Sequence, residues 1–286
     1  MRTVKISGGL GNQMFQYALM TGLQESFDEV VCADISSYSH CNAHNGLELE
    51  RVFPISLTVV KRDPMIARKL TLSRYLNRFL PFLCCKYQFE YPDFRFITSI
   101  YDVKSRKKYY AGYWHNFRYV APFRHKLLQT FTFKVPLDKR NHETLEAISG
   151  RESVGIHVRR GDYLNEAQYQ GICTLEYYRK AIALVHGVLR NPVYYVFSND
   201  MEWCKKHIIP LLDGSEAVCV DWNNGKESYR DMQLMTYCKG LIISNSSFSW
   251  WGAFLNQREK NIIVAPSRWK NAKYDLNIQM PEWTLV

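Results

Sequence analysis

The stretch GLIISNSSFSWWGAF (240–254) shows how the second half of the chain is organised: a short apolar strand, a polar turn, then a helix. The same alternation recurs on both sides of it. The strands that we expect are SVGIHV (153–158), VYYVFSN (193–199), EAVCVD (216–221), GLIISN (240–245) and NIIVAP (261–266). Strands that alternate with helices pair in parallel, and near-continuous runs of Val and Ile are typical of strands buried on both faces. This half is therefore predicted to form an α/β fold around a parallel sheet.

The start of the chain predicts a second unit of the same class. TVKIS (3–7) and EVVCAD (29–34) have the composition of strands, and the glycine-rich GGLGNQ (8–13) follows the first of them. Residues 14–27 carry apolar side chains at helical spacing, which completes a strand, helix, strand unit. We place the domain boundary so that the domains cover residues 1–145 and 146–286.

The segment 61–85 is basic and amphipathic, and it predicts a helix. Such a helix either packs on the surface of the core or rests on an anionic lipid surface as a peripheral membrane contact.

Composition narrows the class of protein. The 286 residues carry a formal net charge of +10, which suits an anionic partner such as a nucleotide, a nucleic acid or a membrane surface. The 8 cysteines form no C-x-x-C pair, so we expect reduced thiols. The opening MRTVKISGGLGN has no apolar signal region, and no stretch approaches the length of a membrane span. These features predict a cytoplasmic protein.

Polar residues follow four of the predicted strands directly. In an open α/β sheet, ligands bind beyond the carboxyl ends of the strands, so these residues should meet at one edge. They are His157, Arg159, Arg160 and Asp162 after the first strand, Ser198, Asn199 and Asp200 after the second, Asp221, Trp222 and Asn223 after the third, and Ser244, Asn245, Ser246 and Ser247 after the fourth.

The motif HVRRGDY (157–163) contains two adjacent arginines, whose forked donors suit phosphate oxygens. Because side chains alternate along an extended chain, Arg159 should share a face with His157 while Arg160 points elsewhere. We expect Arg159 to contact phosphates and Arg160 to form an ion pair, with Asp162 as its candidate partner. The alternative is that both arginines pair with carboxylates.

Two further motifs lie where a strand turns into a helix. SNSSFSWW (244–251) offers hydroxyl groups and a helix N-terminus, which attracts phosphate; the alternative is plain capping of a buried helix. GGLGNQ departs from the dinucleotide pattern G-x-G-x-x-G, because Met14 replaces the last glycine. It either faces a ligand or only makes a tight turn.

Several common motifs are missing from the sequence. We find no G-x-x-x-x-G-K-[ST] loop, no D-x-D pair and no histidines at metal-ligand spacing, and no nucleic-acid module. We therefore expect no metal site and no cofactor.

Together these motifs resemble the bacterial α-1,2-fucosyltransferases of glycosyltransferase family 11. GGLGNQMFQYA, HVRRGDY, FSND followed by Trp203, and SNSSFSWWGA match that family in order and spacing over essentially the whole chain. The resemblance implies a GT-B-like fold, with two Rossmann-like domains whose parallel sheets face each other across a cleft. It implies GDP-fucose as donor substrate in the C-terminal domain and a galactose-terminated glycan as acceptor on the N-terminal side.

The resemblance also implies roles for individual residues. Arg159 would contact the β-phosphate and, with Asn12 and Asp162, form the catalytic group. The substrate-binding set implied in this way comprises His157, Arg160, Asp231, Asn245, Ser246, Ser247, Phe248, Gly9, Gly11 and Gln13. Within it, His157 would contact guanosine, Asp231 would accept from guanine N1 and N2, and Ser246, Ser247 and Phe248 would line the diphosphate and fucose.

The reaction implied is an inverting transfer to the 2-hydroxyl of galactose, stabilised without metal. The related α-1,6 enzymes place a glutamate base ten residues after the histidine, where this chain has Ala167. Asp162 and Glu166 are the nearby carboxylates, and our hypothesis is a dissociative transition state with weak base assistance. The alternatives are another linkage or acceptor, a non-catalytic nucleotide-sugar or glycan-binding protein, and a nucleic-acid binder, which we rank last.

Overall fold

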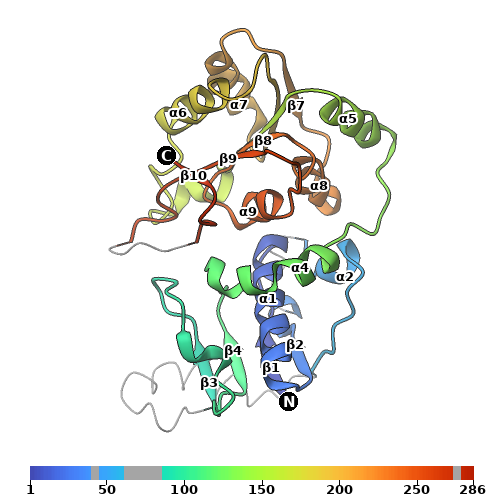
Figure 1. Cartoon of the computed structure of the whole chain (residues 1–286), viewed down its shortest axis with the longest axis vertical. Helices are drawn as coiled ribbons and strands as arrows, with labels where there is room; N and C mark the ends of the chain where they lie inside the picture. The colour runs from blue at the N-terminus through green and yellow to red at the C-terminus, as the bar shows by residue number, and fades with distance from the viewer. Residues whose placement is uncertain (40–44, 61–85, 273–277) are drawn as a thin grey trace. The chain divides into compact units, whose positions relative to one another are not determined.

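The computed structural model describes residues 1–39, 45–60, 86–272 and 278–286 (Figure 1). The predicted basic helix at 61–85 lies outside these residues. The chain forms two compact units, Met1–Lys134 and Val135–Val286. The boundary falls before the expected one because α5 (Lys139–Ser149) packs against α8 (Tyr229–Met235) of the second unit. We describe each unit by itself.

The first unit contains a parallel sheet in the order β2-β1-β4-β3. Its strands are β1 (Arg2–Lys5), β2 (Val31–Asp34), β3 (Tyr87–Phe89) and β4 (Tyr109–Ala111). The helices α1 (Leu10–Phe27), α2 (Leu49–Val52) and α4 (Arg124–Thr130) accompany it, together with the short 3-10 turns η1 (Ser36–Ser39), η2 (Thr98–Tyr101), η3 (Phe117–Tyr119) and η4 (Ala121–Phe123).

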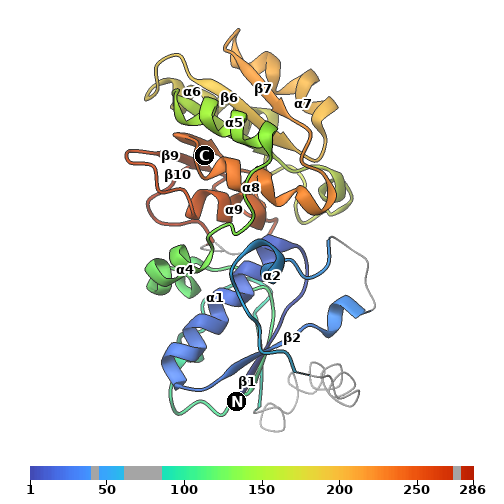
Figure 2. The same ribbon diagram turned by 90° about the vertical axis from the view of Figure 1, so that its right-hand side faces the viewer.

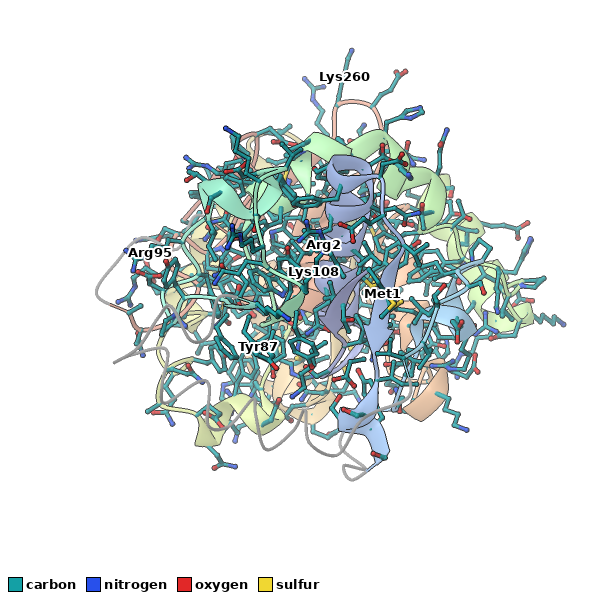
Figure 3. All side chains as sticks on the ribbon, turned by 90° about the horizontal axis from the view of Figure 1, so that it is seen from below. Met1, Arg2, Tyr87, Arg95, Lys108 and Lys260 are labelled. Atoms are coloured by element: carbon teal, nitrogen blue, oxygen red, sulfur yellow. The ribbon has the colours of Figure 1, made fainter. Side chains whose placement is uncertain are left out.

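Helix α1 lies along this sheet (Figure 2). Met14, Phe15, Ala18 and Leu19 are completely buried, which matches the helical spacing in the sequence. At the amino end of β1, the buried Arg2 donates to the Ser105 carbonyl at 3.2 Å and to the Tyr110 hydroxyl at 3.1 Å (Figure 3). One buried side chain therefore ties β1 to β4 and to the loop before it.

The second unit contains a parallel sheet in the order β10-β9-β8-β5-β6-β7. Its strands are β5 (Ser153–Val158), β6 (Val193–Ser198), β7 (Ala217–Val220), β8 (Gly240–Ile242), β9 (Ile262–Ala265) and β10 (Thr284–Leu285). With α5 and α8, its helices are α6 (Leu175–His186), α7 (Met201–His207) and α9 (Ser247–Phe254), and its 3-10 turns are η5 (Gly161–Asn165), η6 (Ile209–Leu212) and η7 (Gly225–Glu227). All five strands expected from the sequence are present.

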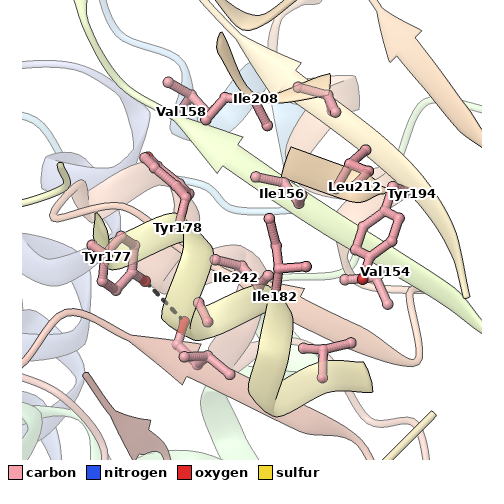
Figure 4. Packing of buried hydrophobic residues seen from close by; sticks show 14 of the residues in the cluster. Val154, Ile156, Val158, Tyr177, Tyr178, Ile182, Tyr194, Ile208, Leu212 and Ile242 are labelled. Atoms are coloured by element: carbon pink, nitrogen blue, oxygen red, sulfur yellow. Dashed lines mark hydrogen bonds between the residues drawn. The ribbon is translucent and has the colours of Figure 1, made fainter. Parts of the chain in front are cut away.

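The two faces of β5 have different surroundings. Val154, Ile156 and Val158 point into a cluster with residues of α6 and α7, where the Tyr177 hydroxyl of α6 also donates to the Val264 carbonyl at 3.3 Å (Figure 4). Each large aliphatic side chain buried in this way stabilises the fold by roughly 1.5–3 kcal/mol. Gly155 lies on the other face, where a Cβ atom would stand 2.7 Å from Leu241. Since side chains alternate, His157 shares that face with Gly155.

The cysteines in the described residues are free thiols: Cys32, Cys173, Cys204, Cys219 and Cys238. In the described part of the chain, no helix is both long enough and apolar enough to span a membrane.

Candidate active site

The strand order brings the ends of β5 and β8 next to each other, and His157 and Ser244 meet there. His157 is 6 % exposed, and its Nδ1 lies 2.8 Å from the Ser244 Oγ. Its ring centroid is 5.7 Å from that of Phe248. Burial, together with the charge of Arg159, lowers the pKa of His157 to about 3. His157 is therefore a neutral hydrogen-bonding group at physiological pH rather than a cation.

The two arginines after β5 diverge, as the alternation predicts. A guanidinium nitrogen of Arg159 lies 2.8 Å from Asp162, and its side chain is 28 % exposed. Arg160 instead pairs through Nε with Asp200 at 3.0 Å and stacks over the Trp203 ring at 4.0 Å. Arg160 does form an ion pair, as predicted, but the prediction that Asp162 is its partner is wrong.

Asp162 pairs with Arg159 instead of Arg160 because of the turn that follows the two arginines. Gly161 adopts a φ of +32°, and the 3-10 turn η5 begins at this residue. Asp162, three residues after Arg159, thereby comes back to the side of Arg159. Arg160 is left facing Asp200, the residue that also caps α7.

The serine-rich loop divides into a buried part and an accessible part. The Ser246 Oγ caps α9 by accepting from the Phe248 N–H at 3.3 Å. Asn245 is 2 % exposed and its side-chain amide donates to the Trp269 carbonyl at 3.0 Å, so it holds the loop in place. Ser247 and Phe248 are partly exposed. The first turn of α9 therefore offers both its backbone and side chains to a ligand.

Asp231 lies in the first turn of α8, which packs against α9 (Figures 1 and 2). One carboxylate oxygen accepts from the Asn223 side chain at 2.8 Å. Burial raises the pKa of Asp231 to about 7, while the bond from Asn223 opposes the shift. A carboxyl group that titrates near neutral pH is typical of a functional site.

A pair of buried amides supports Asp231: Asn223 is among the polar residues expected at the ends of the strands, whereas no sequence motif marks its partner Asn141. Asn141 of α5 and Asn223 exchange two side-chain hydrogen bonds, of 2.8 and 2.9 Å. Asn141 is completely buried, and it also accepts from the Trp222 indole at 3.0 Å. The position of the Asp231 carboxylate is thus fixed by residues from α5 and from the loop after β7.

In the first unit, the glycine-rich loop is occupied by the protein's own side chains. Gly9 is the N-cap of α1, and Glu48, which is 3 % exposed, lies near this end of the helix; burial raises the pKa of its carboxyl group, and Arg51, Asn45 and the backbone of Leu10 oppose the shift. Gln13 is completely buried and donates to the carbonyls of Gly8 and Gly46 at 2.9 and 2.8 Å. Its amide oxygen accepts from the Glu48 N–H at 2.9 Å.

The four candidate residues of this loop therefore differ in what they offer. The side-chain amide of Gln13 is used to hold the backbone of the loop, and Gly11 is buried. Gly9 and Asn12 are partly exposed, and the Asn12 Oδ1 lies 2.9 Å from the His115 Nε2. Sequence reasoning missed both Glu48 and His115, because neither stands in a recognisable motif.

Within the second unit, the structure thus brings together His157, Arg159, Ser246, Ser247 and Phe248 at the carboxyl edge of the sheet, with Asp231 on the neighbouring helix. Among the residues that the structure describes, no group of three or more His, Cys, Asp and Glu side chains could hold a metal ion.

Comparison with known proteins identifies the family. The profile of the family described as Glycosyl transferase family 11 matches residues 1–286. This chain belongs to glycosyltransferase family 11. The family 11 chain is 34% identical to an α-1,2-colitosyltransferase of Escherichia coli, over 93% of this chain and 91% of that protein. It is 26% identical to galactoside α-(1,2)-fucosyltransferase 2 of Rattus norvegicus, over 89% of this chain and 67% of that protein.

Solved structures show the same fold. The α-1,6-fucosyltransferase NodZ, in a crystal soaked with GDP-fucose, has a TM-score of 0.53 and 12% identity, over 89% of this chain and 92% of that one. Arabidopsis thaliana FUT1 in complex with GDP has a TM-score of 0.52 and 13% identity, over 92% of this chain and 69% of that one. These likenesses confirm the expected GT-B-like α/β class.

Proposed function

We propose that this family 11 chain is an inverting galactoside α-1,2-fucosyltransferase, which moves L-fucose from GDP-β-L-fucose to the 2-hydroxyl of a terminal galactose. The observation that carries the proposal is the cluster at the carboxyl edge of the second sheet. A neutral His157, the partly exposed Arg159 and the first turn of α9 converge there, and Asp231 stands on the adjacent helix.

Arg159 and the N-terminus of α9 suit the diphosphate. The ion pair of Arg159 with Asp162 is more than a quarter exposed on both sides, so it contributes only about 0–1 kcal/mol and yields readily to a phosphate. The positive end of α9 and the hydroxyl of Ser247 add donors for the same oxygens. These groups stabilise the charge that develops on the GDP leaving group without a metal ion.

Asp231 suits the guanine base. An ionised carboxylate accepts from N1–H and N2–H together, and it therefore selects guanine over adenine, which has no such donor pair. Asn223 already occupies one carboxylate oxygen from inside the protein, which sets the orientation of the group toward a base.

The role of Asp162 follows from its contact with Arg159. Its carboxylate lies 2.8 Å from the guanidinium and orients it until a phosphate takes its place, so it contributes through Arg159. This supports the hypothesis of a dissociative transition state with weak base assistance. A loss of about three orders of magnitude in kcat in Asp162→Asn or Glu166→Gln, with donor binding intact, would contradict it.

A second donor deserves the same assay, because a colitosyltransferase is among the relatives. Colitose is L-fucose without its 3-hydroxyl. A site that bonds the 3-hydroxyl rejects the deoxy sugar strongly, by roughly 10⁴-fold in the best cases. A panel of GDP-fucose and GDP-colitose with one galactoside acceptor therefore separates the two activities.

The test is transfer from labelled GDP-fucose to lactose or N-acetyllactosamine in EDTA, followed by linkage analysis. We expect transfer to the 2-position, and a loss of about 10²–10³ in kcat in Arg159→Ala. The matched control is Arg179→Ala, an arginine whose side chain is 59% exposed and pairs with Glu176 of its own helix. Binding of GDP without turnover on either donor would favour the non-catalytic alternative. Full activity in Arg159→Ala would contradict the proposal that the diphosphate binds at the HVRRGDY motif.

A further inference from the structure

The carboxyl edge of the first sheet gathers polar and aromatic residues from the ends of all four strands. Tyr38 follows β2, Asn12 follows β1, Glu90 follows β3, and Tyr113 and His115 follow β4. Ligands of open α/β sheets bind at such an edge, yet of these five residues only Asn12 stands in a recognisable motif.

Hydrogen bonds link four of these residues, and the fifth, Tyr38, bonds to the loop that precedes Asn12. The Glu90 carboxylate accepts from the backbone N–H groups of Tyr113 and His115 at 2.7 and 2.8 Å. The Tyr38 hydroxyl donates to the Gly8 carbonyl at 2.8 Å. The turn after β4 also holds Trp114 at a φ of +63°. A non-glycine residue in this region costs of order 1–3 kcal/mol, and such strain concentrates at functional sites.

His115 fixes the side chain of Asn12. The imidazole is 7 % exposed and lies against the rings of Phe15 and Phe94, with centroid distances of 4.9 and 5.2 Å. Since the Asn12 Oδ1 can only accept, the His115 Nε2 carries the hydrogen of the 2.9 Å bond between them. The Asn12 Nδ2 lies over Gly8, where a Cβ atom would be only 2.6 Å away.

Tyr113 provides an accessible aromatic face. Its ring stacks on His115 at 5.3 Å with an interplanar angle of 16°, so one face is covered. The residue is still 40% exposed, although one face of its ring is covered. Galactose presents a face of C–H groups, which is apolar and weakly positive, and the face of an aromatic ring is negative. The two surfaces are complementary.

We infer that two residues at the carboxyl edge of the first sheet serve the acceptor: Tyr113 is the stacking surface for the galactose ring, and His115 is a positioning residue that fixes the Asn12 amide. The inference rests on the proposed function for the identity of the sugar. It assigns the acceptor to residues of the first unit alone.

The binding test needs no turnover. Saturation-transfer NMR of methyl β-galactoside with the GDP-loaded protein reports acceptor contact directly. We expect a clear signal in the natural protein, and loss of most of it in Tyr113→Ala. The matched control is Tyr237→Ala, a tyrosine of similar exposure, 38%, in the second unit. Equal signals in the two variants would overturn the assignment of the site, whatever the donor proves to be.

Kinetics then separate the two residues. We expect Tyr113→Ala to raise the acceptor KM by roughly 2–10-fold, the range of an aromatic contact, while the KM for GDP-fucose stays unchanged. His115→Ala should lower kcat by about 10–100-fold through a misplaced Asn12. His115→Gln keeps an N–H donor and should restore most of that loss. A Gln variant as impaired as the Ala variant would contradict the positioning role.

The pattern of failures identifies which proposal is at fault. No transfer from any donor, together with galactoside binding that depends on Tyr113, would reject the proposed reaction and keep the acceptor site. Transfer with no effect of Tyr113 or His115 would keep the reaction and reject the site.

Discussion

The pKa of Asp231 predicts that donor affinity falls as pH decreases from 8 to 6. Burial raises this pKa to about 7, and guanine needs the ionised carboxylate as acceptor. The ionised fraction is then about 0.9 at pH 8 and about 0.1 at pH 6, and apparent Kd scales inversely with the competent fraction. We therefore expect the Kd of GDP-fucose to be about tenfold weaker at pH 6.

The assay is calorimetric titration with GDP-fucose and no acceptor. The diphosphate diester of GDP-fucose has no proton to exchange in this range, whereas the terminal phosphate of free GDP has a pKa near 6, as other phosphate monoesters do. Asp231→Asn should bind weakly at both pH values and lose the slope. The control is Asp213→Asn, an exposed residue at a φ of +48°, which asparagine also adopts readily. A flat Kd in the natural protein, or an unchanged slope in Asp231→Asn, would refute the guanine assignment.

The same shift has a consequence for stability without ligand. The folded pKa of Asp231 is about 7 against an ordinary value of 3.8, so the folded protein binds more protons than the unfolded chain between these values. The free energy of unfolding therefore decreases as pH rises through that window, by about 4 kcal/mol at most. Asp231→Asn should remove this decrease, which thermal unfolding at pH 5 and pH 8 would measure.

Three further substitutions have effects that follow from packing. Gly155→Ala places a Cβ atom 2.7 Å from Leu241 inside the core and should destabilise the protein by about 1–3 kcal/mol in urea unfolding. Ser246→Ala removes the cap of α9 and should cost about 1 kcal/mol in the same measurement while weakening donor binding. Gly8→Ala forces the Asn12 amide aside at a φ of +79°, and it should lower kcat more than it lowers Tm in paired kinetic and thermal assays.

The second unit was largely predictable from the sequence. Its strands are runs of Val, Ile and aromatic residues buried on both faces, and the parallel order places their polar ends at one edge. The shared face of His157 and Arg159, and the divergence of Arg160, followed from simple alternation. The partner of Arg160 did not, because Asp200 comes from the neighbouring strand end, 40 residues away, and the turn at Gly161 decides the pairing.

The first unit was harder to predict. β3 and β4 are only three residues long and stand in an aromatic-rich stretch with no clear period. The polar pairs that organise both sites join residues far apart in the chain: Asn12 to His115, and Asn141 to Asn223. No local pattern signals such a pair, because each amide or imidazole finds its partner only when the sheets have formed.

Glu48 bears on whether the glycine-rich loop faces a phosphate, as its sequence suggests. The amino end of α1 carries a partial positive charge, and in nucleotide-binding proteins this end receives a phosphate. Here the buried carboxyl group of Glu48 lies near that end, and the Arg51 guanidinium lies 2.5 Å from it. A carboxyl group of the same unit therefore stands near the place where a phosphate binds at such a turn. When ionised, this carboxylate would disfavour a phosphate at the amino end of α1, which agrees with the proposal that the diphosphate binds in the second unit.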